Sequence, residues 1–399
     1  MMTDMQGPLA GIRVLDASRV LAGPFCGQVL GDLGAEVLKI ERPGSGDETR
    51  GWGPPFLGPL SAYFLSCNRN KRGLTLDLAH PEGCRIFHEL AGRSDILLEN
   101  FRADSAERFG LSPAQVLAKH PRLIVCSISG FGRDSSQRDV PGYDFAIQAL
   151  SGFMNITGPV EGPPCKVGVA VTDVLTGLYA AVAVLACLQA RQRSGHGYAI
   201  DLSLLDCAVA GQVNVVQAFL TSGSLPQRQG NAHLQIVPYQ LFATADSWLV
   251  LAVGNDGQWQ RFCKAANRPD LAADQRFTTN TQRVENRTTL VPLVEAVLRT
   301  HSTARWETLL REHEVPHAPV WSYADLFAHP GMAERLRVTV RDPSGQPVDL
   351  VSSPFHLTGA TLPKPTPPPS LGPHTEEVLT KLPGLDREQL TKLRQQRVI

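Results

Sequence analysis

The sequence predicts an α/β protein with a large Rossmann-like domain and a smaller α+β domain. In the first half of the chain, short apolar strands at 11–16, 35–41 and 95–100 alternate with segments of helical periodicity. Apolar strands separated by helices form βαβ units and a mostly parallel sheet. The close spacing of the first two strands suits the start of a Rossmann-like domain. In the second half, two strands joined near 246–247 indicate an antiparallel hairpin.

The segment 173–193 is the strongest helix prediction. Its apolar residues follow the helical period, and the residues between them are also mostly apolar. A helix that is apolar on nearly every side belongs inside a large core. Other helices are expected at 23–33, 81–91 and 204–220, and other strands at 74–77, 123–128 and 198–202.

A change of pattern after Thr221 indicates a second domain. Residues 222–229 are polar and rich in turn formers, which is typical of a linker. We therefore expect a small α+β domain over 222–325. Its predicted elements are the hairpin at 237–253 and helices near 257–266, 285–299 and 303–313. A strand pair within 338–350 and an extended proline-rich segment at 363–369 follow.

Charge and cysteine usage exclude several classes of function. The chain has 38 basic residues (lysine and arginine together) and 38 acidic residues (aspartate and glutamate together), so its formal net charge is zero. The chain as a whole therefore attracts neither nucleic acid nor an anionic membrane. The N-terminal segment has no apolar run, and the most apolar stretch, 178–188, is too short to span a bilayer. The eight cysteines are scattered and form no CxxC pair. We therefore expect a cytoplasmic protein with no metal site, membrane segment or nucleic-acid partner.

Three local motifs carry little weight. Gly44-Ser45-Gly46 resembles a phosphate loop, but neither a convincing helix nor a Lys-Ser/Thr pair follows it. Residues 312–317 contain two histidines, but Pro316 breaks the helix that would align them on a metal ion. The Gly-x-Ser-x-Gly elbow of an α/β-hydrolase does not occur in the sequence.

Asp173 stands at the start of the most apolar predicted helix. From this position alone, it is either a helix N-cap or a functional carboxylate. In the functional interpretation, the positive end of the helix keeps the carboxylate ionised at neutral pH. An ionised carboxylate attacks an electrophile without prior deprotonation. The residue pattern by itself leaves both interpretations open.

A series of motifs gives the chain a specific resemblance. In chain order they are RVLAGP at 19–24, GDLGAEVLKIER at 31–42, GDETR at 46–50, NRNKR at 68–72, ENF at 99–101, PGYD at 141–144 and VAVTD at 169–173. Their order and spacing agree from about residue 8 to residue 380. On these motifs the chain resembles the family III CoA-transferases, which include the formyl-CoA and carnitine CoA-transferases.

The resemblance implies both a fold and a chemistry. Family members are interlocked, ring-like homodimers in which the large domain contains both chain ends, here 1–221 and 326–399. Asp173 is then the nucleophile, coenzyme A or acyl-CoA is bound as a substrate, and no cofactor is tightly held. CoA passes through an aspartyl-CoA thioester to an acceptor acid. Because one thioester replaces another, neither ATP nor a metal ion is needed.

The resemblance also assigns residues to the CoA path. Arg42 and Arg108 fall where family members bind the CoA phosphates, and each guanidinium can chelate two phosphate oxygens. A second group matches positions along the adenosine and pantetheine path or near the thioester. Its members are Val20, Lys71, Arg72, Asn100, Phe101, Tyr143 and Asp144.

Departures from the formyl-CoA transferases indicate the substrate. Leu21 replaces their glutamine, and 231–239 replaces their glycine run, which argues against oxalate. The latter segment is most similar to succinyl-CoA:dicarboxylate CoA-transferases of the glutarate or hydroxymethylglutarate type. Lys166, His233 and Gln235 are candidates for holding a second carboxylate, although each also fits an ordinary polar loop.

Two alternatives remain at this point. An α-methylacyl-CoA racemase of the same superfamily needs an acid–base pair and carries Gly-His-Asp where this chain has Gly-Tyr-Asp at 142–144. Tyr143, with an ordinary pKa of about 10, is a poor substitute for that histidine. The other alternative is a non-catalytic CoA-binding protein. A nicotinamide oxidoreductase is disfavoured because no Gly-x-Gly-x-x-Gly is present.

Overall fold

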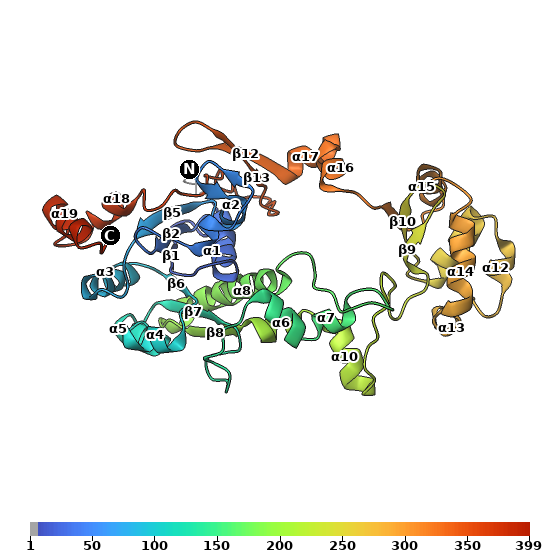
Figure 1. Ribbon diagram of the computed structural model, residues 1–399, viewed down its shortest axis with the longest axis horizontal. Helices are drawn as coiled ribbons and strands as arrows, with labels where there is room; N and C mark the ends of the chain where they lie inside the picture. Colours follow the sequence, from blue (N-terminus) through green and yellow to red (C-terminus); the bar gives the residue numbers. More distant parts are fainter. Residues whose placement is uncertain (1–6) are drawn as a thin grey trace. The chain divides into compact units, whose positions relative to one another are not determined.

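A six-stranded parallel sheet organises the larger part of the chain, of which the computed structural model describes residues 7–399 (Figure 1). The strand order is β5-β2-β1-β6-β7-β8, which is the order of a doubly wound sheet. The predicted α/β class with a mostly parallel sheet is therefore confirmed. The strands are β1 (Arg13–Asp16), β2 (Glu36–Glu41), β5 (Lys71–Thr75), β6 (Ile96–Glu99), β7 (Ile124–Ser129) and β8 (Ala199–Ser203).

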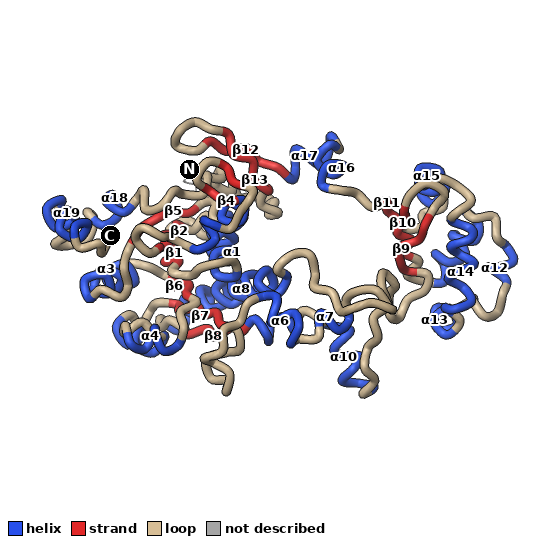
Figure 2. Tube along the Cα trace, viewed as in Figure 1, coloured by secondary structure: helices blue, strands red, loops and turns tan. Residues whose placement is uncertain are grey.

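Helices cover both faces of this sheet (Figure 2). Val14 and Leu15 show why β1 is apolar throughout, because both are fully buried and they belong to the cores on opposite faces. One face carries α1 (Ala22–Asp32), α8 (Val171–Ser194) and α9 (Leu204–Ala210). The other carries α3 (Pro81–Ala91), α5 (Pro113–Lys119), α18 (Thr375–Leu379) and α19 (Arg387–Gln395).

Helix α8 packs closely against α1. A Cβ at Gly177 would lie 2.7 Å from the carbonyl oxygen of Ala22, so glycine permits this approach. The apolar stretch 178–188 lies within α8, which has 24 residues in all. Among the described single helices, α8 alone has the length and composition to cross a membrane, and 44% of its most apolar window is buried within the protein. A core helix passes the same test.

The prediction of a single helix over 204–220 was wrong. The structure has α9 and a separate α10 (Val213–Ser222), with a bend of 79° between them. The break contains Gly211, and Val213 has a φ of 39°. A residue in this left-handed range interrupts the helical hydrogen-bond pattern.

The C-terminal part of the chain returns to the parallel sheet. The proline-rich segment 363–369 forms neither helix nor strand, in agreement with the prediction. Asn70, the residue before β5, forms two hydrogen bonds with Thr366 of this segment. Its N–H donates to the Thr366 carbonyl at 3.2 Å, and its Oδ1 accepts from the Thr366 N–H at 2.7 Å. Gly73 exchanges two hydrogen bonds with His374. The segment therefore covers the edge strand β5.

Shorter elements complete the larger unit. The predicted C-terminal strand pair is present as an antiparallel hairpin. These elements are a 3₁₀ helix (Glu48–Gly51), β3 (Phe56–Leu57), β4 (Leu60–Ser61), α2 (Ala62–Cys67), α4 (Ala103–Arg108), α6 (Asp144–Leu150), β12 (Arg337–Arg341) and β13 (Pro347–Val351).

The smaller unit contains a three-stranded antiparallel sheet with the order β11-β10-β9. The predicted hairpin is present, but the third strand was not predicted because it is only three residues long. Trp259, Phe262 and Trp306 fill the core of this unit. Its strands are β9 (Tyr239–Ala243), β10 (Trp248–Ala252) and β11 (His317–Pro319). Its helices include α11 (Asp256–Ala265), α12 (Pro269–Ala273), α13 (Asn280–Glu285), α14 (Arg287–Leu298), α15 (Thr303–Glu312) and α16 (Tyr323–Ala328).

The described residues divide into two compact units. The larger contains residues up to 153, 167–221 and 334–399, and the smaller contains 154–166 and 222–333. This division groups 154–166 with the smaller unit and ends that unit at 333, whereas the predicted domains group 154–166 with the large domain and place the second boundary at 325. Two short helices lie at these boundaries, α7 (Phe153–Ile156) and α17 (Pro330–Leu336).

Arg228 accounts for the position of the segment 154–166. Its guanidinium donates to the carbonyl oxygens of Asn155, Pro159 and Gly162 at 2.9–3.4 Å. These three hydrogen bonds attach the segment to the smaller unit, although the sequence places it between two parts of the larger one.

Candidate active site

The carboxyl ends of β1 and β6 meet where the strand order of the sheet reverses. Open α/β sheets bind ligands at this position. Arg19 and Val20 lie in the loop that leaves β1, and Asn100 and Phe101 lie in the loop that leaves β6. Arg42 directly follows β2, the next strand along. The topology therefore gathers several of the predicted site residues at one edge of the sheet.

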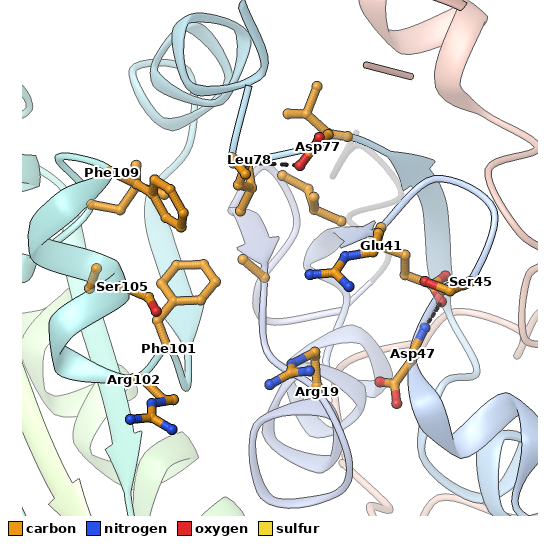
Figure 3. A pocket seen from close by; sticks show the side chains of 18 of the residues that line it. Arg19, Glu41, Ser45, Asp47, Asp77, Leu78, Phe101, Arg102, Ser105 and Phe109 are labelled. Atoms are coloured by element: carbon orange, nitrogen blue, oxygen red, sulfur yellow. Dashed lines mark hydrogen bonds between the residues drawn. The ribbon is translucent and has the colours of Figure 1, made fainter. Parts of the chain in front are cut away.

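A cavity of about 670 Å³ lies beyond these strand ends. Phe101 and Phe109 form an apolar wall on one side, and Leu78 contributes from a different loop (Figure 3). Arg42 and Arg108 line the same cavity, and neither forms an ion pair with a carboxylate among residues 7–399. An apolar wall and two unpaired guanidinium groups suit a ligand that carries both apolar and anionic parts.

A second cavity, of about 380 Å³, contains Asp173. Val20, Ala22 and Tyr143 line it together with this carboxylate. Four residues line both cavities, namely Arg19, Glu48, Phe101 and Arg102. A continuous path therefore leads from Arg42 and Arg108 to Asp173.

Asp173 lies in the first turn of α8, whose N-cap is Ala170, so Asp173 is not the N-cap itself. Burial raises the pKa of Asp173 to about 7, the nearby Asp144 adds to the rise, and a backbone hydrogen bond from Ala22 opposes it. The expectation of a fully ionised carboxylate at neutral pH was wrong, because it considered the helix end and not burial. Protonated and ionised forms of Asp173 coexist near pH 7.

Asp144 holds the start of α8 and does not line the cavity of Asp173. One carboxylate oxygen accepts from the Thr172 N–H at 2.9 Å and from the Thr172 hydroxyl at 2.8 Å. The other accepts from the Gln148 amide at 2.7 Å. Asp144 therefore contacts the residue before Asp173, and a role for Asp144 near the thioester remains a prediction.

The loop between β1 and α1 has a strained backbone at Val20. Its φ of 71° lies in the left-handed region, which is unfavourable for a β-branched residue. The Val20 N–H lies 3.3 and 3.4 Å from the two carboxylate oxygens of Asp47. Asn100 accepts from the Arg19 N–H at 3.0 Å and donates to the Arg19 carbonyl at 2.9 Å. Asp47 and Asn100 thus hold Val20 at the cavity wall.

A buried ionic network lies behind this loop. Lys39 pairs with Asp47 at 3.1 Å and Lys71 pairs with Asp16 at 2.8 Å, and none of the four side chains is exposed. Lys71 also donates to two further acceptors inside the protein. The ammonium group of Lys71 is therefore enclosed and fully hydrogen-bonded, and the assignment of Lys71 to the CoA path remains a prediction.

Arg72 and Leu21 do not line the two cavities, although Val20 and Ala22, the neighbours of Leu21, line the cavity of Asp173. Arg72 pairs with Glu36 at 2.7 Å and with Glu377 at 2.9 Å, so its charge is already neutralised. Leu21 is the buried N-cap residue of α1. A role for Arg72 in CoA binding and for Leu21 in substrate binding remains a prediction.

Sequence reasoning missed Arg102, Arg133 and Arg138, which line the cavity of Asp173. Arg133 pairs at 2.5 Å with Glu99, whose side chain is fully buried at the end of β6. Glu99 in turn accepts from the Phe101 N–H at 2.8 Å, so this pair fixes the wall that both cavities share. An acid that ends a buried strand signals that a cationic partner exists, but it does not identify the partner.

Three predicted substrate residues, Lys166, His233 and Gln235, lie in the smaller unit. The Gln235 N–H donates to His233 Nδ1 at 3.0 Å, and the His233 carbonyl accepts from Arg287 at 3.3 Å. These contacts stabilise the loop that carries both residues. A role in substrate binding remains a prediction for all three.

Comparison with known proteins identifies the family. The sequence profile of CoA-transferase family III matches residues 9–375. The chain is 40% identical to the succinate–glutarate CoA-transferase of Agrobacterium fabrum, covering 97% of this chain and 99% of that protein. It is also 40% identical to the succinyl-CoA:glutarate CoA-transferase of Mus musculus, over 98% and 90%. A CAIB/BAIF family protein from Brucella suis superimposes with a TM-score of 0.82 at 38% identity, over 94% and 99%.

The chain therefore belongs to CoA-transferase family III. It is a CoA-transferase, and CoA thioesters are its substrates. The predicted class of enzyme is confirmed.

Proposed function

We propose that this enzyme transfers CoA from succinyl-CoA to a dicarboxylic acid, of which glutarate is the first candidate, through an aspartyl-CoA thioester on Asp173. The observation that carries the proposal is the continuous path from Arg42 and Arg108 to an unpaired carboxylate. Relatives named for succinyl-CoA and glutarate support the choice of substrates. A relative from Haloarcula hispanica that is named for mesaconate, another dicarboxylate, is 38% identical.

The first half-reaction begins with the ionised form of Asp173. Its carboxylate attacks the thioester carbonyl of succinyl-CoA, which releases CoA thiolate and leaves a mixed anhydride between succinate and Asp173. The thiolate then attacks the aspartyl carbonyl, which forms the aspartyl-CoA thioester and releases succinate. In the second half-reaction, the acceptor carboxylate attacks this thioester and the same steps run in reverse.

Each attack on the aspartyl carbon develops negative charge on the aspartyl oxygen. The Ala22 N–H at the start of α1 is close enough to Asp173 to oppose the rise in the pKa of that carboxyl. This donor is suited to stabilise the oxyanion, because it belongs to a helix N-terminus and costs no reorganisation. Gly177, which permits the close approach of α8 to Ala22, supports the same geometry.

The second carboxylate of the acceptor requires a cationic partner near Asp173. Arg102 and Arg138 line this cavity, and their own ion pairs with Asp104 and Asp139 are long and exposed, at 3.3 and 3.6 Å. Exposed pairs of this kind are weak, so a substrate carboxylate can displace them. We propose these two arginines as partners of the distal carboxylate.

We also propose that the enzyme is an interlocked homodimer in the cytoplasm, with no tightly bound cofactor and no membrane or nucleic-acid partner. Large apolar side chains on α6, α8 and α10 support a subunit interface, because they are exposed in the single chain. Examples are Phe145, Val182 and Leu220, which are 58%, 64% and 68% exposed.

The racemase alternative receives less support. Three relatives that are 33–40% identical over nearly the whole chain are named CoA-transferases or an acyl-CoA transferase. Tyr143 does line the cavity of Asp173, but it is 60% exposed, and it stands where a racemase of this superfamily carries a histidine.

The proposal is tested by incubating the enzyme with succinyl-CoA and a panel of free acids, followed by mass spectrometry of the CoA esters. We expect glutaryl-CoA and free succinate from the wild type. Asp173→Ala should reduce transfer by ~10³-fold or more while CoA still binds, because the covalent route is lost. Borohydride treatment in the presence of succinyl-CoA should modify Asp173.

The matched control is Asp206→Ala, which removes another acid from the first turn of a helix in the same unit. This variant should transfer CoA at the wild-type rate. Full transfer by Asp173→Ala would exclude the covalent mechanism. Exchange of the α-proton of a branched acyl-CoA without CoA transfer would instead support the racemase.

A further inference from the structure

A third cavity, of about 550 Å³, adjoins the cavity of Asp173. Five residues line both of these cavities, namely Arg102, Ala103, Arg133, Arg138 and Asp139. Of residues 7–399, only Arg102 lines both the third cavity and the larger cavity. The cavity of Asp173 therefore continues into two separate spaces. One is the larger cavity, which Arg42 and Arg108 line, and the other is the third cavity.

The third cavity is open at the protein surface. The side chains of Arg138 and Asp139 are 60% and 65% exposed, although both residues also line the cavity of Asp173. Asp104 and Ala114, which line the third cavity and neither of the other two, are exposed as well. A small molecule can therefore pass between solvent and the cavity of Asp173 without entering the larger cavity.

The loop that follows β7 contributes three of the five shared residues. Its base is closed by backbone contact, because a Cβ at Gly130 would lie 2.7 Å from the Gly142 Cα. Within the loop, the Arg133 N–H donates to Asp201 at 2.8 Å, and the Arg133 guanidinium pairs with Glu99 at 2.5 Å. The connection between the two cavities is therefore a fixed part of the fold.

The covalent mechanism requires two routes to Asp173. In the aspartyl-CoA intermediate, the CoA sulfur is bonded to the carbonyl carbon of Asp173, and the rest of CoA stays in its binding path. Succinate must leave and the acceptor acid must enter while CoA remains there. Because the pantetheine chain then fills the way in from the larger cavity, a free acid needs a second opening.

We propose that the third cavity is this second opening, through which the carboxylic acids leave and enter. The inference rests on the proposed function, because only a covalently held CoA makes a separate route necessary. It assigns the larger cavity to CoA and the third cavity to the free acids, and the two meet at the cavity of Asp173.

The charges of the third cavity suit the passage of an anion rather than its retention. Six charged side chains line it, and the acids balance the arginines, namely Arg102, Arg133, Arg138, Asp104, Glu107 and Asp139. The pairs of Arg102 and Arg138 with their neighbouring acids are long and exposed, at 3.3 and 3.6 Å, and such pairs are weak. These two guanidinium groups can therefore contact a passing carboxylate, while the balanced lining does not hold it.

The test places a bulky side chain in the third cavity. Ala114 is an exposed residue of α5, and Ala114→Trp adds an indole there. Because the opening is narrowed, kcat/KM for glutarate should fall ~10-fold. The exchange of ¹³C-labelled succinate into succinyl-CoA should fall by a similar factor. The affinity for CoA, measured by titration calorimetry, should stay at the wild-type value, since Ala114 does not line the larger cavity.

Two comparisons sharpen the test. Acetate is smaller than glutarate, so transfer to acetate should lose less in Ala114→Trp. Ala118→Trp is the matched control, because Ala118 is another exposed alanine of α5 and lines none of the three cavities. This control should match the wild type in transfer, in exchange and in CoA affinity. Equal melting temperatures of the two tryptophan variants would show that Ala114→Trp is folded.

Two outcomes would overturn the proposed acid route. One is wild-type transfer to glutarate and wild-type succinate exchange in Ala114→Trp, and the other is an equal loss of CoA affinity and of transfer to every acid. The route and the proposed function fail separately. Activity in Asp173→Ala would reject the covalent mechanism, whatever Ala114→Trp does. Failure of the wild type to use glutarate would reject that acceptor, and the acid that the panel identifies then replaces glutarate in the same comparison.

Discussion

Two groups of charged residues lie at the carboxyl end of the same parallel sheet, and they are arranged in opposite ways. Behind the β1–α1 loop, Lys39 and Lys71 are buried against Asp47 and Asp16, so each charge has a partner. In the neighbouring cavities, Asp173 and the arginines at 42 and 108 have no ion-pair partner among residues 7–399. The first group stabilises the loops, and the second remains available to a ligand.

The pKa of a buried carboxylate also shifts in opposite directions in the two regions. Burial alone would raise the pKa of Asp16, but Lys71 and Lys39 hold it below its ordinary value. Asp173 has no such cation, and burial together with Asp144 raises its pKa to about 7. The position of the nearest ammonium group thus separates a structural aspartate from a reactive one.

The largest expected effect is a loss of stability when an ion pair of the buried group is broken. Lys71→Met leaves the Asp16 carboxylate buried without its hydrogen-bonded partner, so the free energy of unfolding should fall by ~3–5 kcal/mol. Urea denaturation followed by circular dichroism measures this change. Arg299→Ala is the control, because it breaks the exposed pair with Glu295 and should change stability by less than ~0.5 kcal/mol. Similar losses in the two variants would contradict the distinction between the regions.

A smaller effect is expected from the unpaired group. Arg108→Ala should weaken CoA binding ~10-fold, because one charged contact to phosphate is lost. The free energy of unfolding should change by less than ~0.5 kcal/mol, since Arg108 is exposed and forms no ion pair among the described residues. Calorimetric titration with CoA and urea denaturation measure the two quantities. A variant that loses stability and keeps CoA affinity would reverse the assignment of Arg108.

The smallest effect concerns the reactive carboxylate. Because the ionised form of Asp173 is the nucleophile, kcat/KM for succinyl-CoA should rise ~10-fold between pH 6 and pH 8, with a midpoint near the pKa of about 7. Asp144→Asn removes a nearby negative charge and should move this midpoint to lower pH by less than ~1 unit. Rate profiles of the two proteins between pH 5 and pH 9 provide the measurement. A midpoint that moves upward would rule out the assumed effect of Asp144.

The sequence was sufficient for features that depend on a local pattern. The apolar strands and the segments between them predicted the parallel sheet, and the VAVTD motif located Asp173 at the start of α8. The family resemblance located Arg42, Arg108 and Phe101, which line the larger cavity. In these cases a residue and its immediate neighbours carry the information.

The sequence was insufficient where the outcome depends on distant partners. Lys71 and Arg72 are adjacent basic residues, yet Lys71 is enclosed by Asp16 and Arg72 is neutralised by Glu36 and Glu377. Pairing in three dimensions decides which cations remain free, and a single sequence does not contain that pairing.

The packing of the C-terminal proline-rich segment along the edge strand β5 has a consequence for the synthesis of this protein. Asn70 and Thr366, which bond to each other, are 296 positions apart, so the edge strand emerges from the ribosome long before its cover. At about 5–20 residues per second, the interval is roughly 15–60 seconds. During that time the nascent chain exposes the unpaired amides and carbonyls of a sheet edge, which neighbouring nascent chains or a chaperone can contact.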